Sequence, residues 1–459
     1  MAKAPLSKSA IRRVKEGVED ELLALPGVQG VDINEKTVKG KGTGELSIVV
    51  YVKKKKPKSG LTKAQMIPAE IDGIPTDIQE EEIELQGASL LLTDVEPQID
   101  TGTYTPLRGG ISMGPCRSVF LAPPDVPAPG NYVFTGTFGA VVKDRTTGAA
   151  MALTNFHVAC IDDGWSVGDV MAQPSRVDTG SCPSDRFGTL TRAVLSENVD
   201  GAVVKLDSGK SYDCSIEEIG GVRGTVAASD GMAVRKRGRT TELTYGTVNS
   251  TDVSVTIDYG DGLGTRTLKK QIRVIPDTSQ NARFSDKGDS GSVVVDGNEK
   301  VLGLLFAGTT SGSATYLNPI QKALDELDVD LCVKPYSIVT KPVICDPLKT
   351  RAIVCYLVTQ PSICHILTRP KLCQLLTVPR LCTIRTLASC PPRTLACPRV
   401  TLACGWDRRF PPIGDFRSDG SPAEAYGRPD AEGTDDAFWL GYYTALEALS
   451  EAEEDESDD

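Results

Sequence analysis

The sequence predicts a mainly β protein, and three observations lead to that prediction. Between residues 111 and 332, short apolar segments alternate with clusters of Gly, Asp, Asn and Ser, which is typical of an all-β sandwich or barrel. Apolar residues recur at helical spacing chiefly at residues 7–25 and 321–327. Most cysteines crowd into residues 332–404. These patterns divide the chain into residues 1–88, 89–110, 111–332, 333–404 and 405–459.

Residues 1–88 are predicted to form a small α+β domain without a catalytic constellation of its own. Its helix, at residues 7–25, is capped by Ser7. The lysine run at 53–56 is interpreted as a solvated strand end rather than a nucleic-acid site, because no aromatic residues are interleaved with it. The other predicted elements are strands at 28–34 and 46–52 joined by a hairpin loop at 39–44, a short helix at 62–65 and a strand near 76–84.

Prolines and glycines mark residues 89–110 as a linker or arm. The β region that follows closes with a helix at 321–327. Its predicted strands lie at residues 139–143, 150–153, 188–191, 201–206, 246–249, 253–258, 269–274, 292–295 and 301–306.

Charge is distributed unevenly along the chain, whose formal net charge is −11. Residues 333–404 carry 10 bases and 1 acid, whereas residues 405–459 carry 4 bases and 16 acids. The remaining body is mildly acidic, so charge offers no argument for a nucleic-acid partner. Attraction between the basic segment and the acidic tail would support self-association, within one chain or between chains. A solubilising tail beside an exposed basic stretch is the alternative.

Composition also bears on the compartment. No run approaches the 18 apolar residues that a membrane span needs, so no membrane partner is expected. The N-terminus has no apolar signal-peptide core, which predicts a cytoplasmic protein. The 13 cysteines are an odd number, and we expect mainly reduced thiols or ligands rather than a disulfide framework.

Two histidines occur in the chain, and one of them, His157, lies in the stretch Thr-Asn-Phe-His-Val-Ala. A Gly-Asp-Ser-Gly-Ser element places Ser290 133 residues later. A serine hydroxyl needs a base to become a nucleophile, and histidine has the suitable unperturbed pKa. The other histidine, His365, lies in the cysteine-rich segment. Elimination therefore points to His157 as the base for Ser290.

Asp200 is the best candidate for the acid that orients His157. It stands at the head of an apolar strand, where a carboxylate can be held beside an imidazole with little solvent. There it would fix the tautomer of the ring and stabilise the imidazolium. Glu197 and Asp207 are rivals, but neither is followed by Gly-Ala and a hydrophobic run.

The order and context of these elements resemble the trypsin-like serine peptidases, which have a chymotrypsin-like double β-barrel. Within that family the chain looks closest to bacterial relatives of the plant narrow-leaf proteins, which often carry a small N-terminal domain. The resemblance covers about residues 1–332. It rests on residues 136–145, 153–158, 236–241, 246–248, 284–295, 303–308 and 318–320, and on the N-terminal patterns at 43–55 and 67–77.

The resemblance implies roles for individual residues. Ser290 would attack the peptide carbonyl and His157 would shuttle the proton. The backbone N–H groups of Gly288 and Ser290 would form the oxyanion hole, and a Cβ at position 288 would often obstruct that conformation. Asp289 would be buried and would brace the loop.

The chain also departs from the secreted trypsins. No activation-cleavage sequence precedes Gly136, so something other than a new N-terminal amine must satisfy Asp289, or the loop is ordered without it. Cys160 has no obvious partner. The specificity pocket would have Phe284 at its floor, where trypsins keep an aspartate. With Phe306, Ala307 and Gly308 beside it, this pocket predicts a preference for apolar or small side chains.

The cysteine-rich segment repeats the pattern Thr-x-Pro-x-x-Cys, and a proline in each unit excludes a long helix. Ordered stacking of extended units, a flexible arm, and metal binding or crosslinking remain open, although the Cys-x2-Cys knuckles of zinc sites are missing. An amphipathic helix is predicted at residues 436–449, before an acidic run at 451–459.

These patterns predict a cytoplasmic serine endopeptidase that acts on proteins or peptides without a cofactor or metal. One alternative is a catalytically silent binding or assembly protein that associates through the cysteine repeat. The other is a self-processing protease that trims its own repeat or acidic tail.

Overall fold

The structure, a computed structural model, describes residues 7–38, 40–91, 99–123, 126–260 and 262–335. The chain forms two compact units, Met1–Pro335 and Tyr336–Asp459. In the second unit only two short parallel strands are described, β25 (Leu367–Thr368) and β26 (Arg385–Thr386). The predictions for the cysteine repeat and the acidic tail otherwise lie outside the described residues.

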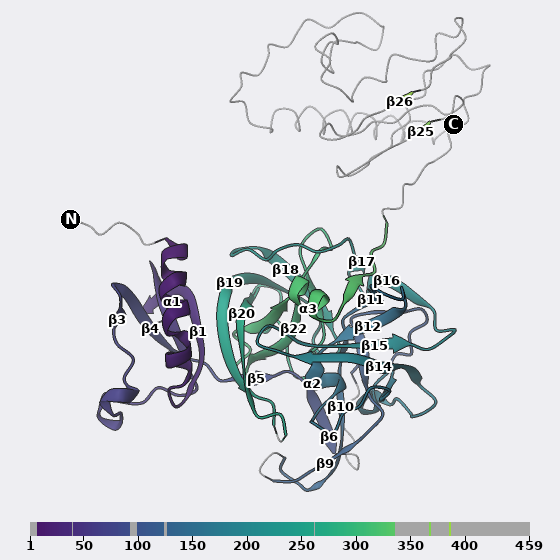
Figure 1. Cartoon of the computed structure of the whole chain (residues 1–459), viewed down its shortest axis with the longest axis horizontal. Helices are drawn as coiled ribbons and strands as arrows, with labels where there is room; N and C mark the ends of the chain where they lie inside the picture. Colours follow the sequence, from purple (N-terminus) through teal and green to yellow (C-terminus); the bar gives the residue numbers. More distant parts are fainter. Residues whose placement is uncertain are drawn as a thin grey trace, which may run out of the picture. The chain divides into compact units, whose positions relative to one another are not determined.

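The N-terminal part packs one helix on a small sheet (Figure 1). Helix α1 (Lys8–Leu23) begins after Ser7, whose hydroxyl accepts a hydrogen bond from the Ala10 N–H at 3.3 Å. Its apolar side buries Ile11 and Leu22 against the strands. The predicted helix and hairpin are confirmed. The strands are β1 (Val28–Val38), β2 (Lys41–Val52), β3 (Glu70–Ile71) and β4 (Ile74–Glu80), with 3₁₀ turns at Lys58–Gly60 and Lys63–Gln65.

This small sheet continues into the rest of the unit. Strand β1 pairs antiparallel with β19 (Glu242–Asp258) through Val31 and Ser254. Beside that junction the Lys15 ammonium lies 2.5 Å from the Glu19 carboxylate, and both groups hydrogen-bond the Ser254 hydroxyl. Arg12 binds Asp252 through two hydrogen bonds of 2.6 and 2.8 Å. Arg12, Lys15 and Glu19 therefore fix the helix of the N-terminal part to β19.

Residues 111–332 contain the first of two closed barrels. Strand β10 runs through Gly139 into β11. Its last residues, 136–138, pair with β8, and residues 140–143 of β11 pair with β12. The order then continues through β15, β14 and β13 back to β8, which closes the ring. The strands are β8 (Ile111–Pro115), β10 (Gly130–Phe138), β11 (Ala140–Asp144), β12 (Ala150–Thr154), β13 (Val170–Ala172), β14 (Arg186–Leu195) and β15 (Asp200–Leu206).

The second barrel is also closed. Its strands follow the order β18, β21, β22, β23, β20, β19, and β19 pairs back with β18. Every pairing within the ring is antiparallel. The chymotrypsin-like double barrel predicted from the sequence is therefore confirmed by the topology itself. Besides β19, the strands are β18 (Ala233–Gly238), β20 (Thr265–Pro276), β21 (Val293–Val295), β22 (Val301–Thr309) and β23 (Thr315–Pro319).

Short elements complete the unit. The predicted closing helix is α3 (Ile320–Glu326), and the strand after it, β24 (Val329–Leu331), pairs with β11. The remaining elements are β7 (Leu107–Gly109), β9 (Val119–Leu121), α2 (Phe156–Ala159), η3 (Arg176–Asp178), β16 (Tyr212–Ile216) and β17 (Gly220–Gly221).

The prediction of one continuous strand near residues 76–84 is wrong, because two separate strands occupy this stretch. Strand β4 ends at Glu80, and a separate strand, β5 (Ile83–Leu85), pairs with β22 of the second barrel. The next strand, β6 (Ala88–Leu91), pairs with β10 of the first barrel. Alternation of side chains identifies extended backbone but not the strand that it pairs with. Part of the segment predicted as a linker, 89–110, is therefore strand.

The expectation of mainly reduced cysteines is wrong for four of the five cysteines in residues 111–332. Cys116 is bonded to Cys182, and Cys214 to Cys332, whereas Cys160 is free and buried. The partners are 66 and 118 residues apart and meet only through the barrel fold, so no local spacing indicates them. Disulfides are typical of oxidising compartments, and the cytoplasmic location stays a prediction.

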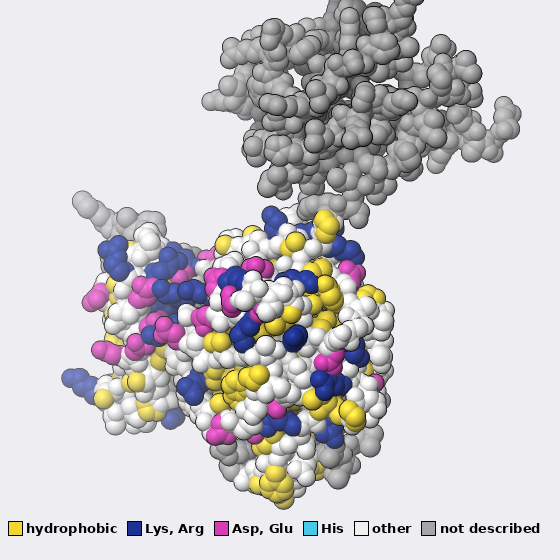
Figure 2. All heavy atoms as spheres, turned by 45° about the vertical axis from the view of Figure 1, so that its right-hand side comes forward, with side chains coloured by type: hydrophobic (Ala, Val, Ile, Leu, Met, Phe, Trp, Pro, Cys, Tyr) yellow, Lys and Arg dark blue, Asp and Glu magenta, His cyan; other side chains and the backbone are white. Residues whose placement is uncertain are grey.

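The surface of the described part is mixed in charge. On the face shown in Figure 2, basic and acidic side chains are interspersed, and apolar side chains form small groups between them. Lys53, in the lysine run, lies 2.5 Å from the Glu82 carboxylate. Among the helices of the described residues, none combines the length and the apolarity needed to cross a membrane.

Candidate active site

The three predicted catalytic residues meet at the junction of the two barrels. His157 lies in α2, directly after β12, and Asp200 is the first residue of β15 in the same barrel. Ser290 lies in the turn before β21 of the second barrel. His157 Nδ1 is 2.5 Å from Asp200 Oδ2, and His157 Nε2 is 2.8 Å from Ser290 Oγ. The imidazole therefore stands between the carboxylate and the hydroxyl.

Asp200 has no exposed surface, and its carboxylate is held by donors. Besides the His157 ring, it accepts hydrogen bonds from the His157 N–H at 3.2 Å and the Tyr259 hydroxyl at 2.9 Å. Its backbone is fixed by the side chains of Asn155 and Asn318, at 2.7 and 3.1 Å. Of its rivals, Asp207 is paired with Arg186 at 2.7 Å. Asp200 is the acid that the fold brings to His157.

Sequence reasoning missed Tyr259. This tyrosine follows β19, 59 residues after Asp200, and no local pattern connects the two. Burial and the neighbouring Asp200 charge raise the pKa of Tyr259 well above its ordinary value. The phenol therefore stays protonated and remains a hydrogen-bond donor to the carboxylate.

The predicted oxyanion hole consists of two backbone N–H groups that converge on one oxygen. The N–H groups of Gly288 and Ser290 both donate to the carbonyl oxygen of Gln86, with N···O distances of 2.6 and 3.4 Å. Gly288 has a φ of +100°, and a Cβ there would lie 2.2 Å from Thr240 Oγ1. This position requires glycine, because a Cβ would obstruct the conformation in which the amide points at the oxyanion.

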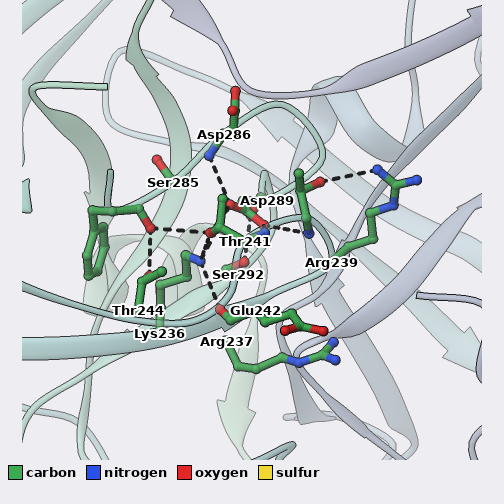
Figure 3. A network of polar contacts seen from close by, with 12 residues as sticks. Lys236, Arg237, Arg239, Thr241, Glu242, Thr244, Ser285, Asp286, Asp289 and Ser292 are labelled. Carbon is green, nitrogen blue, oxygen red and sulfur yellow. Dashed lines mark hydrogen bonds and ion pairs between the residues drawn. The ribbon is translucent and has the colours of Figure 1, made fainter. Parts of the chain in front are cut away.

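Asp289 is buried beneath this loop, and its partners lie in the network of Figure 3. Its carboxylate accepts hydrogen bonds from the Thr240 N–H at 2.8 Å, the Thr241 hydroxyl at 2.6 Å and the Asp286 N–H at 2.9 Å. The Lys236 ammonium lies 3.4 Å away, and both charged side chains are fully buried. The cation that faces Asp289 is therefore a lysine of β18 rather than an N-terminal amine.

Burial lowers the pKa of Lys236 from its ordinary value, and the charge of Asp289 opposes that shift. The ammonium also donates to the hydroxyl of Thr241 and, at 3.1 Å, to the carbonyl of Glu242. Because these contacts satisfy the ammonium inside the barrel, the ion pair anchors the loop without a free chain end.

The first barrel supports the same loop. The Thr137 hydroxyl donates to the Gly288 carbonyl at 3.0 Å and accepts from the Arg239 N–H at 3.0 Å. The Arg239 guanidinium, in turn, is paired with Asp178 of the first barrel at 2.5 Å. Burial would raise the pKa of Asp178, but hydrogen bonds from Arg239 and neighbouring serines outweigh it and lower the pKa. The two barrels are thus coupled next to the candidate nucleophile.

Three of the four predicted specificity residues lie along the edge of β22 that faces the site. The Phe306 carbonyl oxygen accepts a hydrogen bond from the Gln86 N–H at 3.1 Å and lies 3.2 Å from Ser290 Oγ. Ala307 and Gly308 pair with residues of β5. Phe284, in contrast, is fully buried among the apolar side chains of the second barrel. The predicted preference for apolar or small side chains stays a prediction.

Within residues 7–38, 40–91, 99–123, 126–260 and 262–335, no group of three or more His, Cys, Asp or Glu side chains could hold a metal ion. The second histidine, His365, lies outside the described residues.

Comparisons with known proteins bear on the fold alone. No family model matches the chain, and no curated protein matches it. Among solved structures, it is similar to Thermobifida fusca protease A, with 23% identity over 44% of this chain and 92% of that one, and a TM-score of 0.33. It is also similar to the Nocardiopsis protease, with 20% identity over 49% of this chain and 97% of that one, and a TM-score of 0.34. The Cellulomonas bogoriensis chymotrypsin is 21% identical over 43% of this chain and 91% of its own length, with a TM-score of 0.31.

Proposed function

We propose that the chain is a serine endopeptidase that hydrolyses peptide bonds of proteins or peptides through an acyl-enzyme intermediate. The observation that carries the proposal is the hydrogen-bonded line from Asp200 through His157 to Ser290, which ends beside two N–H groups aimed at a single carbonyl oxygen. That arrangement contains a nucleophile, a base, an orienting acid and an oxyanion hole.

Each group has a defined task in this chemistry. His157 Nε2 takes the proton of Ser290 Oγ as the oxygen attacks the carbonyl carbon, and later gives a proton to the leaving amine. Asp200 holds the Nδ1–H tautomer and stabilises the imidazolium. The N–H groups of Gly288 and Ser290 stabilise the negative oxygen that forms, an effect worth about 10²–10³-fold in rate for a single donor.

We also propose a cellular location, a related family and a mode of self-association for this protein. We propose a cytoplasmic protein related to the plant narrow-leaf proteins, on the residues quoted above. Alkylation of free thiols in the native cell before lysis, read out at Cys116 and Cys214, checks the compartment. Self-association through the basic repeat and acidic tail depends on residues outside those described.

Labelling by a fluorophosphonate, mapped to the modified residue, tests the proposal. We expect the label on Ser290 and its loss in Ser290→Ala and His157→Ala. Hydrolysis of an unfolded protein substrate should fall by about 10⁶-fold in both variants. Ser285→Ala is the matched control, because Ser285 is equally buried but bonds Thr315 instead of His157. Persistent labelling of Ser290→Ala would show that the nucleophile is misassigned.

A further inference from the structure

A segment of the chain itself crosses the candidate active site. Residues 83–91, which we call the crossing segment, begin as β5 against β22 of the second barrel and end as β6 against β10 of the first. In the register, Glu84 lies opposite Gly308, and Ala88 lies opposite Thr135. Gln86 and Gly87 connect the two strands, so extended backbone passes from one barrel to the other directly over the cleft.

The carbonyl group of Gln86 occupies the predicted oxyanion hole. Its oxygen accepts from the N–H groups of Gly288 and Ser290, while its own N–H donates to the Phe306 carbonyl at 3.1 Å. Three backbone hydrogen bonds therefore fix both sides of this residue. Donors aimed at a carbonyl oxygen are what a peptide needs for attack by a neighbouring nucleophile.

The side chain of Gln86 is buried beside Gly308, one of the predicted specificity residues. Only 3% of Gln86 is exposed, and a Cβ on Gly308 would lie 2.1 Å from Gln86 Nε2. The absence of a side chain at Gly308 thus leaves the space that the Gln86 side chain fills. The side chain that the structure places beside Gly308 is long and polar rather than small and apolar.

Gly87, on the other side of the same peptide bond, lies against the histidine ring. A Cβ on Gly87 would be 3.0 Å from His157 Cδ2 and 3.3 Å from His157 Nε2. The nitrogen of the Gln86–Gly87 bond belongs to this residue. The bond therefore has its carbonyl oxygen on the two donors and its amide side beside the group that would protonate a leaving amine.

We propose that the Gln86–Gly87 bond is the enzyme's own substrate and is cut within the same chain. This inference rests on the proposed function. Ser290 Oγ bonds to the Gln86 carbonyl carbon and loses its proton to His157, the C–N bond breaks, and the Gly87 nitrogen leaves with that proton. Water then adds to the ester and gives a proton to His157, which passes it to Ser290 Oγ as the ester bond breaks and leaves a free carboxyl group at Gln86. The net reaction adds one water to one peptide bond.

Cleavage leaves the two pieces together. Residues up to Gln86 stay bound through the pairing of β1 with β19, the ion pairs of α1 and the pairing of β5 with β22. The new carboxyl group of Gln86 remains at the oxyanion hole, so the N-terminal fragment inhibits the enzyme until it is displaced. Substrates in trans then compete for the same groove, and those with Gln before the cut bond and Gly after it fit best.

Intact-mass analysis of the purified full-length chain tests this inference. We expect wild type to consist of two fragments, divided between residues 86 and 87, and Ser290→Ala to stay intact. Tagged Ser290→Ala mixed with wild type should also stay intact, because cleavage occurs within one chain. An intact wild type, or a cut at another bond, would overturn the inference.

A second variant separates the inference from the proposed function. In Gly87→Val the added Cβ would push the crossing segment away from His157, so we expect no cut at this bond but strong fluorophosphonate labelling of Ser290. Gly297→Val is the control, because no atom lies within 4 Å of the added Cβ, and it should be cut like wild type. If wild type stays intact while Gly87→Val is labelled at Ser290, self-cleavage is wrong and the proposed function stands. If neither the wild type nor a folded Gly87→Val is labelled or active, the proposed function fails as well.

Discussion

Two fully buried carboxylates lie close to the candidate nucleophile, and their surroundings differ. Asp200 has no exposed surface and is held by the His157 ring and the Tyr259 hydroxyl. Asp289 is equally buried, but it faces the Lys236 ammonium and the N–H groups of its own and a neighbouring loop. One acid thus faces a group that gains and loses a proton, and the other faces a lysine cation.

Under the proposed function, this difference separates a catalytic carboxylate, Asp200, from a structural one, Asp289. In the proposed mechanism, the charge of Asp200 is compensated fully only when His157 carries a second proton, the state that would form as Ser290 attacks. The charge of Asp289 is compensated by Lys236, so it rigidifies the loop that presents the two oxyanion donors. Changing Asp200 should therefore act on the rate, and changing the partner of Asp289 should act on stability.

The largest effect that distinguishes the two acids is expected from Asp200→Asn. The amide keeps the shape of the side chain but favours the wrong tautomer of His157, and triads of this kind lose about 10⁴-fold in kcat from that change. The midpoint of urea unfolding should move little in comparison. Hydrolysis of a peptide that spans residues 83–91, compared between the variant and wild type, measures the loss. A decrease of only a few-fold would assign the orienting role to another residue.

The second effect is expected from Lys236→Met, which removes the cation and leaves Asp289 buried without it. Removing one partner of a buried ion pair typically costs about 3–5 kcal/mol of unfolding free energy. The double variant Lys236→Met/Asp289→Asn should recover part of that loss, because no uncompensated charge remains. Urea unfolding of the three proteins measures both values. If the single and double variants are equally stable, the pair does not anchor the loop.

The sequence predicts the surroundings of Asp200 better than those of Asp289. His157 and Ser290 could be assigned because a chain with two histidines leaves few choices, and Asp200 because its context differs from that of Glu197 and Asp207. The partner of Asp289 could not be assigned. Lys236 is 53 positions away on another strand of the barrel and sits in an ordinary basic stretch, so only strand pairing brings the two together.

The crossing segment shows the same limit. Residues 83 and 84 were predicted as the end of a strand and residues 89–91 as part of a linker, which correctly identifies extended backbone for residues 83 and 84. The sequence pattern of residues 83–91 does not indicate which strands they pair with. Whether a strand completes its own sheet or pairs with a barrel edge depends on which edge is free, and residues 307–309 supply that edge more than 200 positions later. The two disulfides escaped prediction for the same reason.

The smallest effect is expected from Tyr259→Phe, which removes one neutral donor from Asp200 and keeps the ring. A hydrogen bond to a charged group contributes about 1.5–3 kcal/mol, so we expect kcat to fall by about 10- to 150-fold. The phenol acts on the reaction only through Asp200, and Asp200→Asn removes the charge that it stabilises. The double variant Tyr259→Phe/Asp200→Asn should therefore be hardly slower than Asp200→Asn alone. Fully additive losses in this double-mutant cycle would mean that Tyr259 acts independently of the carboxylate.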